Sequence, residues 1–290
     1  MSHHYGIDNV AVIGAGTMGH GIAQVAASVG CRTVLFDVDG SALDRAMARV
    51  RANLEKGVSL GKLTPDQCAE TLSNLATTDD LATAVDGVDL VVEAVPEVLS
   101  LKARILENVQ ELAPERTILA TNTSSLSISA MAAVLENPGR FVGLHFFNPV
   151  HIMKLVEVVW GPETADDTRA AAVAFVRRLE KEPVVVKDSP GFASSRLGIV
   201  LGLEAMRMVE EGVAAPEDID AAMELGYRHP MGPLKLTDLV GLDVRLGIAE
   251  YLHGALESEA FRPPQILRDM VADGRLGKKS GRGFYEYSKR

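Results

Sequence analysis

The sequence predicts an α/β protein in which a doubly wound, mostly parallel sheet is followed by an all-helical domain. Three observations lead to this prediction. Short β-rich segments alternate with longer amphipathic segments from the N-terminus to about residue 187. The early strand segments, 9–13 and 89–92, are almost continuously apolar, which is typical of parallel strands covered by helices on both faces. Beyond residue 187 the pattern is helical, with little sign of strands.

The first domain, residues 1–187, is expected to contain seven strands. They are expected at residues 9–13, 33–36, 89–94, 117–120, 141–146, 154–159 and 183–186. Between the second and third of these strands, apolar residues recur at helical spacing and predict an amphipathic helix: Leu43, Met47, Val50 and Leu54.

The second domain, residues 188–290, begins where Pro190 and Gly191 interrupt the last strand. Ser189 is expected to cap a helix that starts near Pro190. A further helix start is expected at Ala215-Pro216, and residues 229–233 are expected to form a tight turn between helices.

Two long apolar stretches in this domain, 197–203 and 234–246, exceed what one small helical domain normally covers by itself. An exposed apolar surface of that size favours association, so a homodimer through these helices is expected. The basic, glycine-rich segment 278–283 predicts a surface turn ahead of an aromatic anchor at 284–287.

Length and composition narrow the class of protein. The chain has 290 residues, which suits about two domains, and its net charge of −10 argues against binding to nucleic acid or anionic membranes. No apolar run is as long as a membrane span, and the first apolar stretch lacks a cationic leader. Cys31 and Cys68 fit a reducing compartment, so a cytoplasmic protein is expected. His3 and His4 are expected to belong to an unstructured start rather than to a metal site.

The segment Gly14-Ala15-Gly16-Thr17-Met18-Gly19 follows the first expected strand and opens a helix expected near Met18. In such a motif the first glycine permits a tight turn, the second lets the backbone approach a pyrophosphate, and the third lets helix and strand pack closely. The helix N-terminus then offers N–H groups to the phosphates. A Rossmann-type dinucleotide site is therefore predicted, the alternative being a glycine-rich turn in an unrelated α/β protein.

Asp37 supports the dinucleotide site, because it lies eighteen residues after Gly19, where a ribose-binding carboxylate is expected. Asp37 and Asp39 would repel a 2′-phosphate, which favours NAD over NADP. Arg32 and Arg45 are close in sequence to Asp37, so a contact of either with a 2′-phosphate remains an open alternative.

His145 and Glu157 each lie within an apolar strand segment. A carboxylate at such a position is costly unless it is paired. Twelve residues separate the two, enough for a strand, a turn and a returning strand to bring them side by side. A glutamate bonded to one imidazole nitrogen would leave the other as a general base. From the spacing alone, it is equally plausible that His145 is a core histidine and Glu157 an edge-strand carboxylate, neither with a catalytic function.

The hydroxyl-rich run at 121–125 follows a predicted strand, so it lies at the strand's carboxyl end, where open α/β sheets bind ligands. The same residues are equally suited to cap a helix beginning near Ser127. The sequence has no nucleophile elbow, zinc-ligand cluster or phosphate loop of the GxxxxGK type, so metal catalysis and nucleoside triphosphate hydrolysis are not expected.

Several segments together resemble the L-3-hydroxyacyl-CoA dehydrogenases, including bacterial 3-hydroxybutyryl-CoA dehydrogenases. The segments are Val12-Ile13-Gly14-Ala15-Gly16-Thr17-Met18-Gly19, Asn122-Thr123-Ser124-Ser125-Leu126, Gly143-Leu144-His145-Phe146-Phe147-Asn148-Pro149-Val150, Lys187-Asp188-Ser189-Pro190-Gly191-Phe192 and Gly281-Arg282-Gly283-Phe284-Tyr285. The resemblance implies an NAD domain, a helical dimerisation domain and an acyl-CoA substrate held between them.

The resemblance also implies roles for individual residues. His145 would be the general base, Glu157 its orienting partner and Ser124 a hydrogen-bond partner of the substrate's 3-oxygen. From the motif and the resemblance together, the expected cofactor-binding residues are Gly14, Gly16, Thr17, Met18, Gly19, Asp37, Glu97, Lys102, Asn122 and Asn148. Without the resemblance, Lys102 would be interpreted as a surface lysine on a helix.

The chain departs from this family at Ser195, where many relatives carry an asparagine that contacts the substrate. A serine is shorter and offers fewer donors, which puts that contact and the preferred acyl group in doubt. Residues 45–62 hold five basic side chains against one acidic one, which suits either CoA phosphates or a solvated helix face.

The reaction expected from the resemblance is reversible, NAD-dependent oxidation of a 3-hydroxyacyl-CoA to a 3-oxoacyl-CoA. Two alternatives remain open: a dehydrogenase of the same fold that acts on a free hydroxy acid such as a sugar acid, and a non-catalytic, crystallin-like relative that keeps the cofactor.

Overall fold

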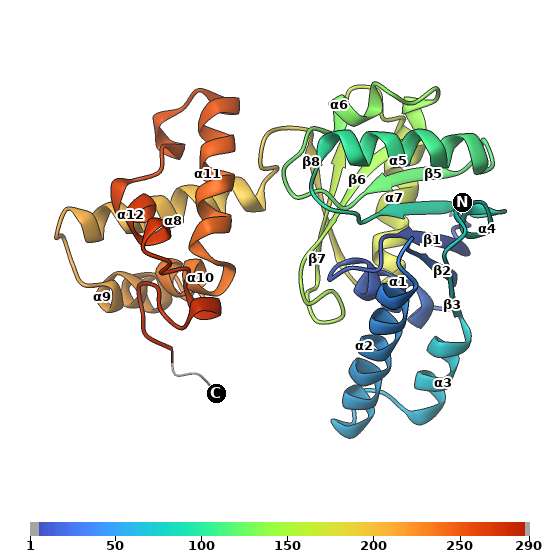
Figure 1. Ribbon diagram of the computed structural model, residues 1–290, viewed down its shortest axis with the longest axis horizontal. Coiled ribbons are helices and arrows are strands. Elements are labelled where there is room, and N and C mark those ends of the chain that lie inside the picture. The colour runs from blue at the N-terminus through green and yellow to red at the C-terminus, as the bar shows by residue number, and fades with distance from the viewer. Residues whose placement is uncertain (1–5, 288–290) are drawn as a thin grey trace. The chain divides into compact units, whose positions relative to one another are not determined.

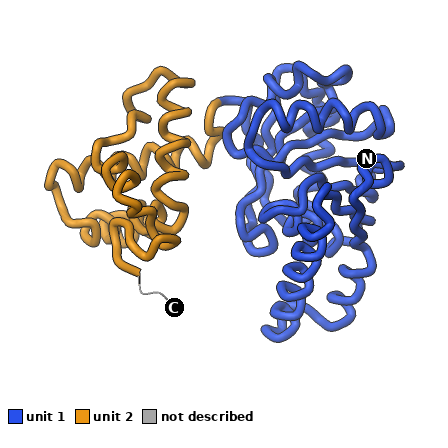
Figure 2. Tube along the Cα trace, viewed as in Figure 1, with its two compact units in different colours: residues 1–189 blue, residues 190–290 orange. Residues whose placement is uncertain are grey.

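The computed structural model describes residues 6–287, so His3 and His4 lie outside the described part of the chain. The chain forms two compact units, one ending at Ser189 and the other beginning at Pro190 (Figure 2). Each unit has a hydrophobic core of its own. The architecture is the predicted one, a mostly parallel sheet with flanking helices followed by a helical domain.

The first unit is built on an eight-stranded sheet with the strand order β3-β2-β1-β4-β5-β6-β7-β8 (Figure 1). The strands are β1 Asn9–Ile13, β2 Arg32–Phe36, β3 Leu75–Thr78, β4 Leu90–Glu93, β5 Ile118–Thr121, β6 Phe141–Phe146, β7 Leu155–Trp160 and β8 Glu182–Lys187. The helices are α1 Gly19–Ser28, α2 Gly40–Ser59, α3 Pro65–Ser73, α4 Leu81–Val85, α5 Leu99–Leu112, α6 Ile128–Ala132, η1 Pro138–Arg140 and α7 Asp166–Arg178. All neighbouring strands are parallel except β6 and β7, which are antiparallel.

The apolar strands form where both faces of the sheet are covered. In β1, the side chains of Val10, Ala11, Val12 and Ile13 are all 0% exposed. Because successive side chains of a strand point to opposite faces, this burial requires helices on both sides of the sheet. The near-continuous apolar pattern therefore reflects the position of β1 in the middle of the sheet.

All seven expected strands are present, with ends that differ by at most a residue or two. The structure adds β3, which the sequence did not indicate. Of its four residues only Leu75 is buried, and the strand pairs on one side only, with β2. A short edge strand of this kind has too little alternation to be recognised from sequence.

The second unit is helical. Its helices are α8 Ser194–Glu210, α9 Pro216–Ala221, η2 Ala222–Gly226, α10 Pro233–Val240, α11 Leu242–Leu256, η3 Glu259–Phe261, α12 Gln265–Ala272 and η4 Lys278–Ser280. The expected helix start at Pro216 is confirmed, with Ala215 as its N-cap. The expected helix start near Pro190 with Ser189 as its cap is wrong, because α8 begins at Ser194 after Ala193. Gly191 and Phe192 have φ angles of 74° and 48°, which an α-helix does not accommodate.

The aromatic segment 284–287 anchors the C-terminal part of the chain, and its contacts are with two buried carboxylates that the sequence did not indicate. Asp238 accepts hydrogen bonds from the backbone N–H groups of Phe284 and Tyr285, both at 2.9 Å. The hydroxyl of Tyr285 donates to Asp220 at 2.7 Å. Gly283 is required here because a Cβ would overlap the Asp238 carboxylate. Both aspartates are 0% exposed, so the tail supplies donors that their burial demands.

Tyr285→Phe is expected to lower the free energy of unfolding by about 2 kcal/mol, because a buried carboxylate loses a charge-assisted hydrogen bond. Burial and the neighbouring Asp220 raise the pKa of Tyr285, so its hydroxyl stays a donor at ordinary pH. Tyr287→Phe is the matched control, since its hydroxyl bond to Asp238 is longer, at 3.1 Å. Urea unfolding of both variants checks this, and an equal or larger loss in Tyr287→Phe would contradict it.

Candidate active site

The glycine motif forms the turn between β1 and α1, and α1 begins at Gly19, one residue from the expected start. Gly14 has a φ angle of 106°, and its N–H donates to the carbonyl of Phe36 at 2.8 Å. A Cβ on Gly19 would overlap the carbonyl oxygen of Gly14, whereas a Cβ on Gly16 would meet nothing within 4 Å. The turn is therefore tightly packed at Gly19, whereas the backbone at Gly16 is open, as the approach of a ligand requires. Met18 precedes α1 and makes no side-chain cap, so it leaves the helix N–H groups available to an anion.

Asp37 is bonded to the glycine turn rather than lying apart from it. Its carboxylate accepts from the N–H of Ala15 at 2.8 Å and from the N–H of Asp39 at 3.0 Å. Arg45, one of the two cations near this site in sequence, pairs with Asp39 at 3.1 Å and with Ser41 at 2.7 Å. The carboxylate is therefore held in place at the end of β2.

A cavity of about 520 Å³ lies over this turn. Its polar side is formed by the glycine turn and Asp37, and its other walls are apolar: Phe36, Val38, Ala94, Val95, Pro96, Leu101 and Ile105. An apolar slot beside a carboxylate and an open glycine backbone fits an adenosine with its diphosphate. The residues present are therefore suited to hold NAD.

His145 and Glu157 are direct partners in the antiparallel β6–β7 pair. The Nδ1 atom of His145 lies 2.8 Å from Oε2 of Glu157, and the two side chains are 9% and 1% exposed. The strand, turn and returning strand therefore bring the two side chains together. The ring of Phe147 lies 4.4 Å from the imidazole, centroid to centroid, and adds an apolar neighbour.

Asn122 and Ser124 follow β5 at the same edge of the sheet. The side-chain oxygen of Asn122 accepts from the N–H of Phe146 at 2.9 Å, which braces the residue after His145. Ser124 contacts Glu97, whose Oε1 accepts from the Ser124 N–H at 2.9 Å and from its hydroxyl at 3.3 Å. The capping interpretation of this run is wrong, because α6 begins at Ile128 and its N-cap is Ser127, whose hydroxyl accepts from the N–H of Ala130 at 3.1 Å.

Lys102 is not a surface lysine, since it is 1% exposed. Its ammonium donates to both oxygens of Glu93, at 2.8 and 3.1 Å, and lies 3.2 Å from Glu97. Burial alone would raise the pKa of Glu97, but Lys102 and the hydrogen bonds from Thr123 and Ser124 lower it below its ordinary value. Glu97 is therefore ionised and links Lys102 to Ser124.

Two further residues, which the sequence analysis did not single out, hold groups around the site in place by hydrogen bonds. Glu93 ends β4 with 0% exposure and also accepts from the Thr121 hydroxyl at 2.6 Å. Its signal was the one that marked Glu157, a carboxylate in an apolar strand segment. Lys181 donates to the carbonyls of Val150 and Met153, both at 2.6 Å. No pattern in the sequence marks Lys181, because its partners are backbone groups of a distant loop.

Asn148 and Thr17 line a second cavity, of about 300 Å³, with Arg49 and His151. The loop that carries Asn148 follows β6 directly and is the one that Lys181 holds. Ser195 lies in the first turn of α8, in the second unit.

Lys181 makes stability depend on pH. Burial, helped by Lys154, lowers its pKa from 10.5 to about 8. Between these values the unfolded chain binds more protons than the folded one, so the free energy of unfolding rises with pH. The wild type is expected to gain stability relative to Lys181→Met between neutral pH and about pH 9.5.

Urea unfolding at both pH values tests this expectation. Lys181→Arg is the control, because its cation does not titrate in this range. An equal gain in all three proteins would contradict the assignment to Lys181.

Comparison with known proteins gives a single result. The family model described as "3-hydroxyacyl-CoA dehydrogenase, NAD binding domain" matches residues 9–189, and the C-terminal domain model of the same family matches residues 191–287. The chain is 42% identical to a probable 3-hydroxybutyryl-CoA dehydrogenase of Bacillus subtilis over 98% of this chain and 99% of the relative. It is 43% identical to the mitochondrial hydroxyacyl-coenzyme A dehydrogenase of Sus scrofa, over 97% and 91%. The crystal structure of (S)-3-hydroxybutyryl-CoA dehydrogenase from Ralstonia eutropha matches with a TM-score of 0.95 and 42% identity, covering 98% and 100%.

The fold and the glycine turn define an NAD-dependent oxidoreductase with a Rossmann-type domain. More specifically, the chain belongs to the 3-hydroxyacyl-CoA dehydrogenase family. Over residues 6–287, no helix is both long and apolar enough to cross a membrane. The same residues contain no cluster of three or more His, Cys, Asp or Glu side chains arranged to hold a metal ion.

Proposed function

We propose that the protein oxidises (S)-3-hydroxyacyl-CoA to 3-oxoacyl-CoA reversibly, with His145 as general base and Glu157 as its orienting partner. The proposal rests on the 2.8 Å contact between Nδ1 of His145 and Oε2 of Glu157. His145 lies near the carboxyl end of β6, on the side of the sheet where the glycine turn follows β1. Family membership supports the reaction class, and the buried pair supports the base.

The His145–Glu157 pair sets the protonation pattern of the imidazole. With Nδ1–H donating to Glu157, the other nitrogen, Nε2, is the acceptor that takes the proton of the substrate's 3-hydroxyl. The carboxylate then stabilises the imidazolium that forms. Bound at the glycine turn and Asp37, NAD would supply the acceptor for the hydride that leaves C3 of the substrate. In the reverse direction, the protonated imidazole returns its proton to the 3-oxygen.

Ser124 is the second group we assign to the substrate's 3-oxygen. Its backbone N–H holds Glu97 at 2.9 Å, so its hydroxyl can turn from the longer 3.3 Å contact with Glu97 and donate to a lone pair of the 3-oxygen, whose single proton goes to His145. In the reverse direction the hydroxyl turns to donate to the carbonyl. Lys102 positions Glu97 through their 3.2 Å ion pair, which makes it a positioning residue for Ser124.

We place the CoA phosphates at the basic residues of α2 and the turn after it. Arg49 lines the cavity that also holds Asn148, and Arg45, Arg51, Lys56 and Lys62 are exposed along the same stretch. An acidic protein needs such a local cationic region to receive an anionic thioester. Ser195 is assigned to the substrate as the counterpart of the asparagine in many relatives, with a shorter reach.

The helical unit is proposed to form a homodimer. Its exposed apolar side chains include Leu239, Val240 and Val244, which are 51%, 41% and 44% exposed. Light scattering of Leu239→Glu beside the wild type tests this: a shift from dimer to monomer is expected, and a monomeric wild type would contradict it. The free thiols of Cys31 and Cys68 support a reducing compartment, proposed to be the cytoplasm.

The experiment that tests the function is an NADH assay with 3-oxoacyl-CoA thioesters of short, medium and long chains, run beside the free acids. Oxidation of NADH with the thioesters is expected. Equal turnover of the free acids would favour a dehydrogenase of free hydroxy acids. No turnover of either, with NAD still bound, would favour a non-catalytic relative.

A further inference from the structure

Arg245 of the second unit is buried without a partner. It lies in the first turn of α11 and is 7% exposed. Its Nε is enclosed and has no hydrogen-bond partner among the described residues, and its Nη1 and Nη2 also lack one there but are not fully enclosed. Burial lowers the pKa of Arg245 to about 10, so the guanidinium is still charged at neutral pH. An unpaired buried charge is costly, and an anion that reaches Nη1 and Nη2 would offset that cost.

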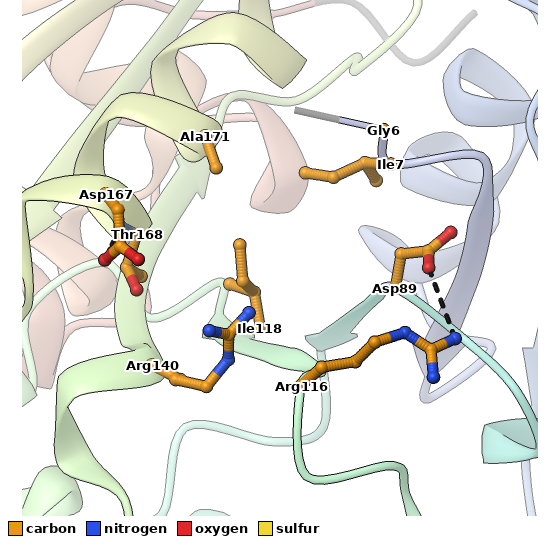
Figure 3. A pocket seen from close by; sticks show the side chains of 9 residues that line it. All are labelled: Gly6, Ile7, Asp89, Arg116, Ile118, Arg140, Asp167, Thr168 and Ala171. Atoms are coloured by element: carbon orange, nitrogen blue, oxygen red, sulfur yellow. Dashed lines mark hydrogen bonds and ion pairs between the residues drawn. The ribbon is translucent and has the colours of Figure 1, made fainter. Parts of the chain in front are cut away.

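Other charged side chains show what Arg245 lacks. Even Arg116, whose side chain is 64% exposed, lies 3.6 Å from a carboxylate oxygen of Asp89, as the dashed line in Figure 3 shows. Within residues 6–287, the other buried acidic and basic side chains each have a hydrogen-bond partner: Glu93, Lys102, His145, Glu157, Lys181, Asp220 and Asp238. Arg245 is the exception in this group.

The acidic side chains of the two helices around Arg245 are bonded elsewhere. On α11, Asp243 accepts from Lys279 at 2.6 Å. On the same helix, Glu250 accepts from Arg268 at 2.6 Å. The two acidic residues of α8 also have partners: Glu204 and Glu210. Neither helix therefore has a carboxylate to spare for Arg245, which leaves this charge to a bound molecule.

The end of the guanidinium lies next to Gly198 of α8. A Cβ on Gly198 would meet Nη1 of Arg245 at 3.5 Å and no other side chain within 4 Å beyond its chain neighbours. One turn further along α8, a Cβ on Gly202 would meet the hydroxyl oxygen of Thr237 at 3.3 Å, so the helix is covered there. The surface of α8 is therefore open beside Arg245, where ligand atoms can take the place of a side chain.

Ser195 lies one turn before Gly198 on α8, and residues three apart are neighbours on a helix surface. Ser195, Gly198 and Arg245 all belong to the second unit. Ser195 is assigned to the substrate by the proposed function, on which this inference rests. Three residues advance about 4.5 Å along a helix, which is about the length of three C–C bonds of roughly 1.5 Å. A chain that begins with C3 at Ser195 therefore reaches Arg245 with its sixth carbon.

A guanidinium presents parallel N–H groups that match the two oxygens of a carboxylate. We propose that Arg245 binds the terminal carboxylate of a dicarboxylic 3-hydroxyacyl-CoA whose acyl chain has about six carbons. The hydrocarbon segment between C3 and this carboxylate lies over Gly198. Arg245 is thus the residue that distinguishes a chain ending in a carboxylate from one ending in a methyl group.

Binding of adipyl-CoA and hexanoyl-CoA, measured by isothermal titration calorimetry, tests this assignment. Both acyl chains have six carbons, one ends in a carboxylate and the other in a methyl group, and neither carries the 3-oxygen that reacts. The wild type is expected to bind adipyl-CoA tenfold or more tightly than hexanoyl-CoA. Arg245→Met is expected to lose this preference by weakening adipyl-CoA alone.

Two controls accompany the titration. Arg245→Met keeps the side-chain length and removes an unpaired buried charge, so it is expected to fold at least as well as the wild type in urea unfolding. Arg268→Met removes an exposed arginine of the same unit that pairs with Glu250, and it is expected to keep the preference for adipyl-CoA.

NADH oxidation with 3-oxoadipyl-CoA and 3-oxohexanoyl-CoA separates this inference from the proposed function. Arg245→Met is expected to raise KM for 3-oxoadipyl-CoA tenfold or more and to leave its kcat, and both constants for 3-oxohexanoyl-CoA, unchanged. Turnover of neither thioester would contradict the proposed function, while the titration still decides whether Arg245 binds the carboxylate.

Four outcomes would overturn the proposal. Equal binding of the two thioesters to the wild type would show that no carboxylate is recognised. A preference for adipyl-CoA that persists in Arg245→Met would assign it to another residue. An equal loss of both thioesters in this variant would give Arg245 a structural role. A shift of Arg245→Met from dimer to monomer in light scattering would assign its partner to a second copy of the chain.

Discussion

His145→Gln is expected to lower kcat with an acyl-CoA substrate by roughly a hundredfold or more, while the dissociation constant of NAD stays unchanged. The amide cannot take the hydroxyl proton, whereas the glycine turn and Asp37, which are assigned to the cofactor, are not altered. Steady-state kinetics and an NAD titration of the same preparation measure the two quantities.

The matched control is His253→Gln, which removes a half-buried histidine paired with Glu259 at 3.4 Å. It should leave kcat unchanged. Glu157→Gln should lower kcat by a smaller factor than His145→Gln, because the base remains but loses the charge that stabilises its protonated form. Unchanged turnover in His145→Gln would contradict the mechanism, and weaker NAD binding together with lost turnover would point to a structural role.

Gly16→Ala and Gly19→Ala are expected to separate the folding function of the glycine turn from its binding function. A Cβ on Gly16 meets open space, so Gly16→Ala should fold like the wild type but bind NAD tenfold or more weakly. A Cβ on Gly19 overlaps the Gly14 carbonyl oxygen, so Gly19→Ala should also lose about 1–3 kcal/mol of stability.

Thermal unfolding and NAD titration of the two variants check this prediction. Gly40→Ala is the control, because a Cβ there also meets nothing within 4 Å at the start of α2. Wild-type NAD affinity in Gly16→Ala would show that the backbone at this position does not approach the cofactor. Equal destabilisation by both substitutions would show that the packing argument is wrong.

Features of the fold could be predicted from the sequence where the residues that determine them are close together in the chain. Periodicity and the glycine motif located the central strands and the turn before α1, because burial on both faces leaves a continuous apolar run. The spacing of His145 and Glu157 also sufficed, since one strand, one turn and one returning strand make their pairing nearly local.

Features that depend on contacts between distant segments of the chain could not be predicted from the sequence. Lys102 has the spacing of an ordinary helical lysine, and only the arrangement of β4 and α5 reveals that it is buried against Glu93 and Glu97. The start of α8 was misplaced because nothing in the sequence shows that Phe192, with its Cβ, adopts a left-handed backbone. β3 was missed because an edge strand with one buried residue leaves no pattern.

The hydrogen bonds from the C-terminal aromatic segment to Asp220 and Asp238 affect when the helical unit can finish folding during synthesis. Asp238 is synthesised more than forty residues before the groups that donate to it, whereas Asp220 also accepts from the N–H groups of Leu234 and Lys235. A nascent helical unit therefore carries the Asp238 carboxylate without its hydrogen-bond donors until residues 283–287 emerge from the ribosome. Residues 283–287 close this unit, and a product that terminates before Gly283 would be left open to proteolysis.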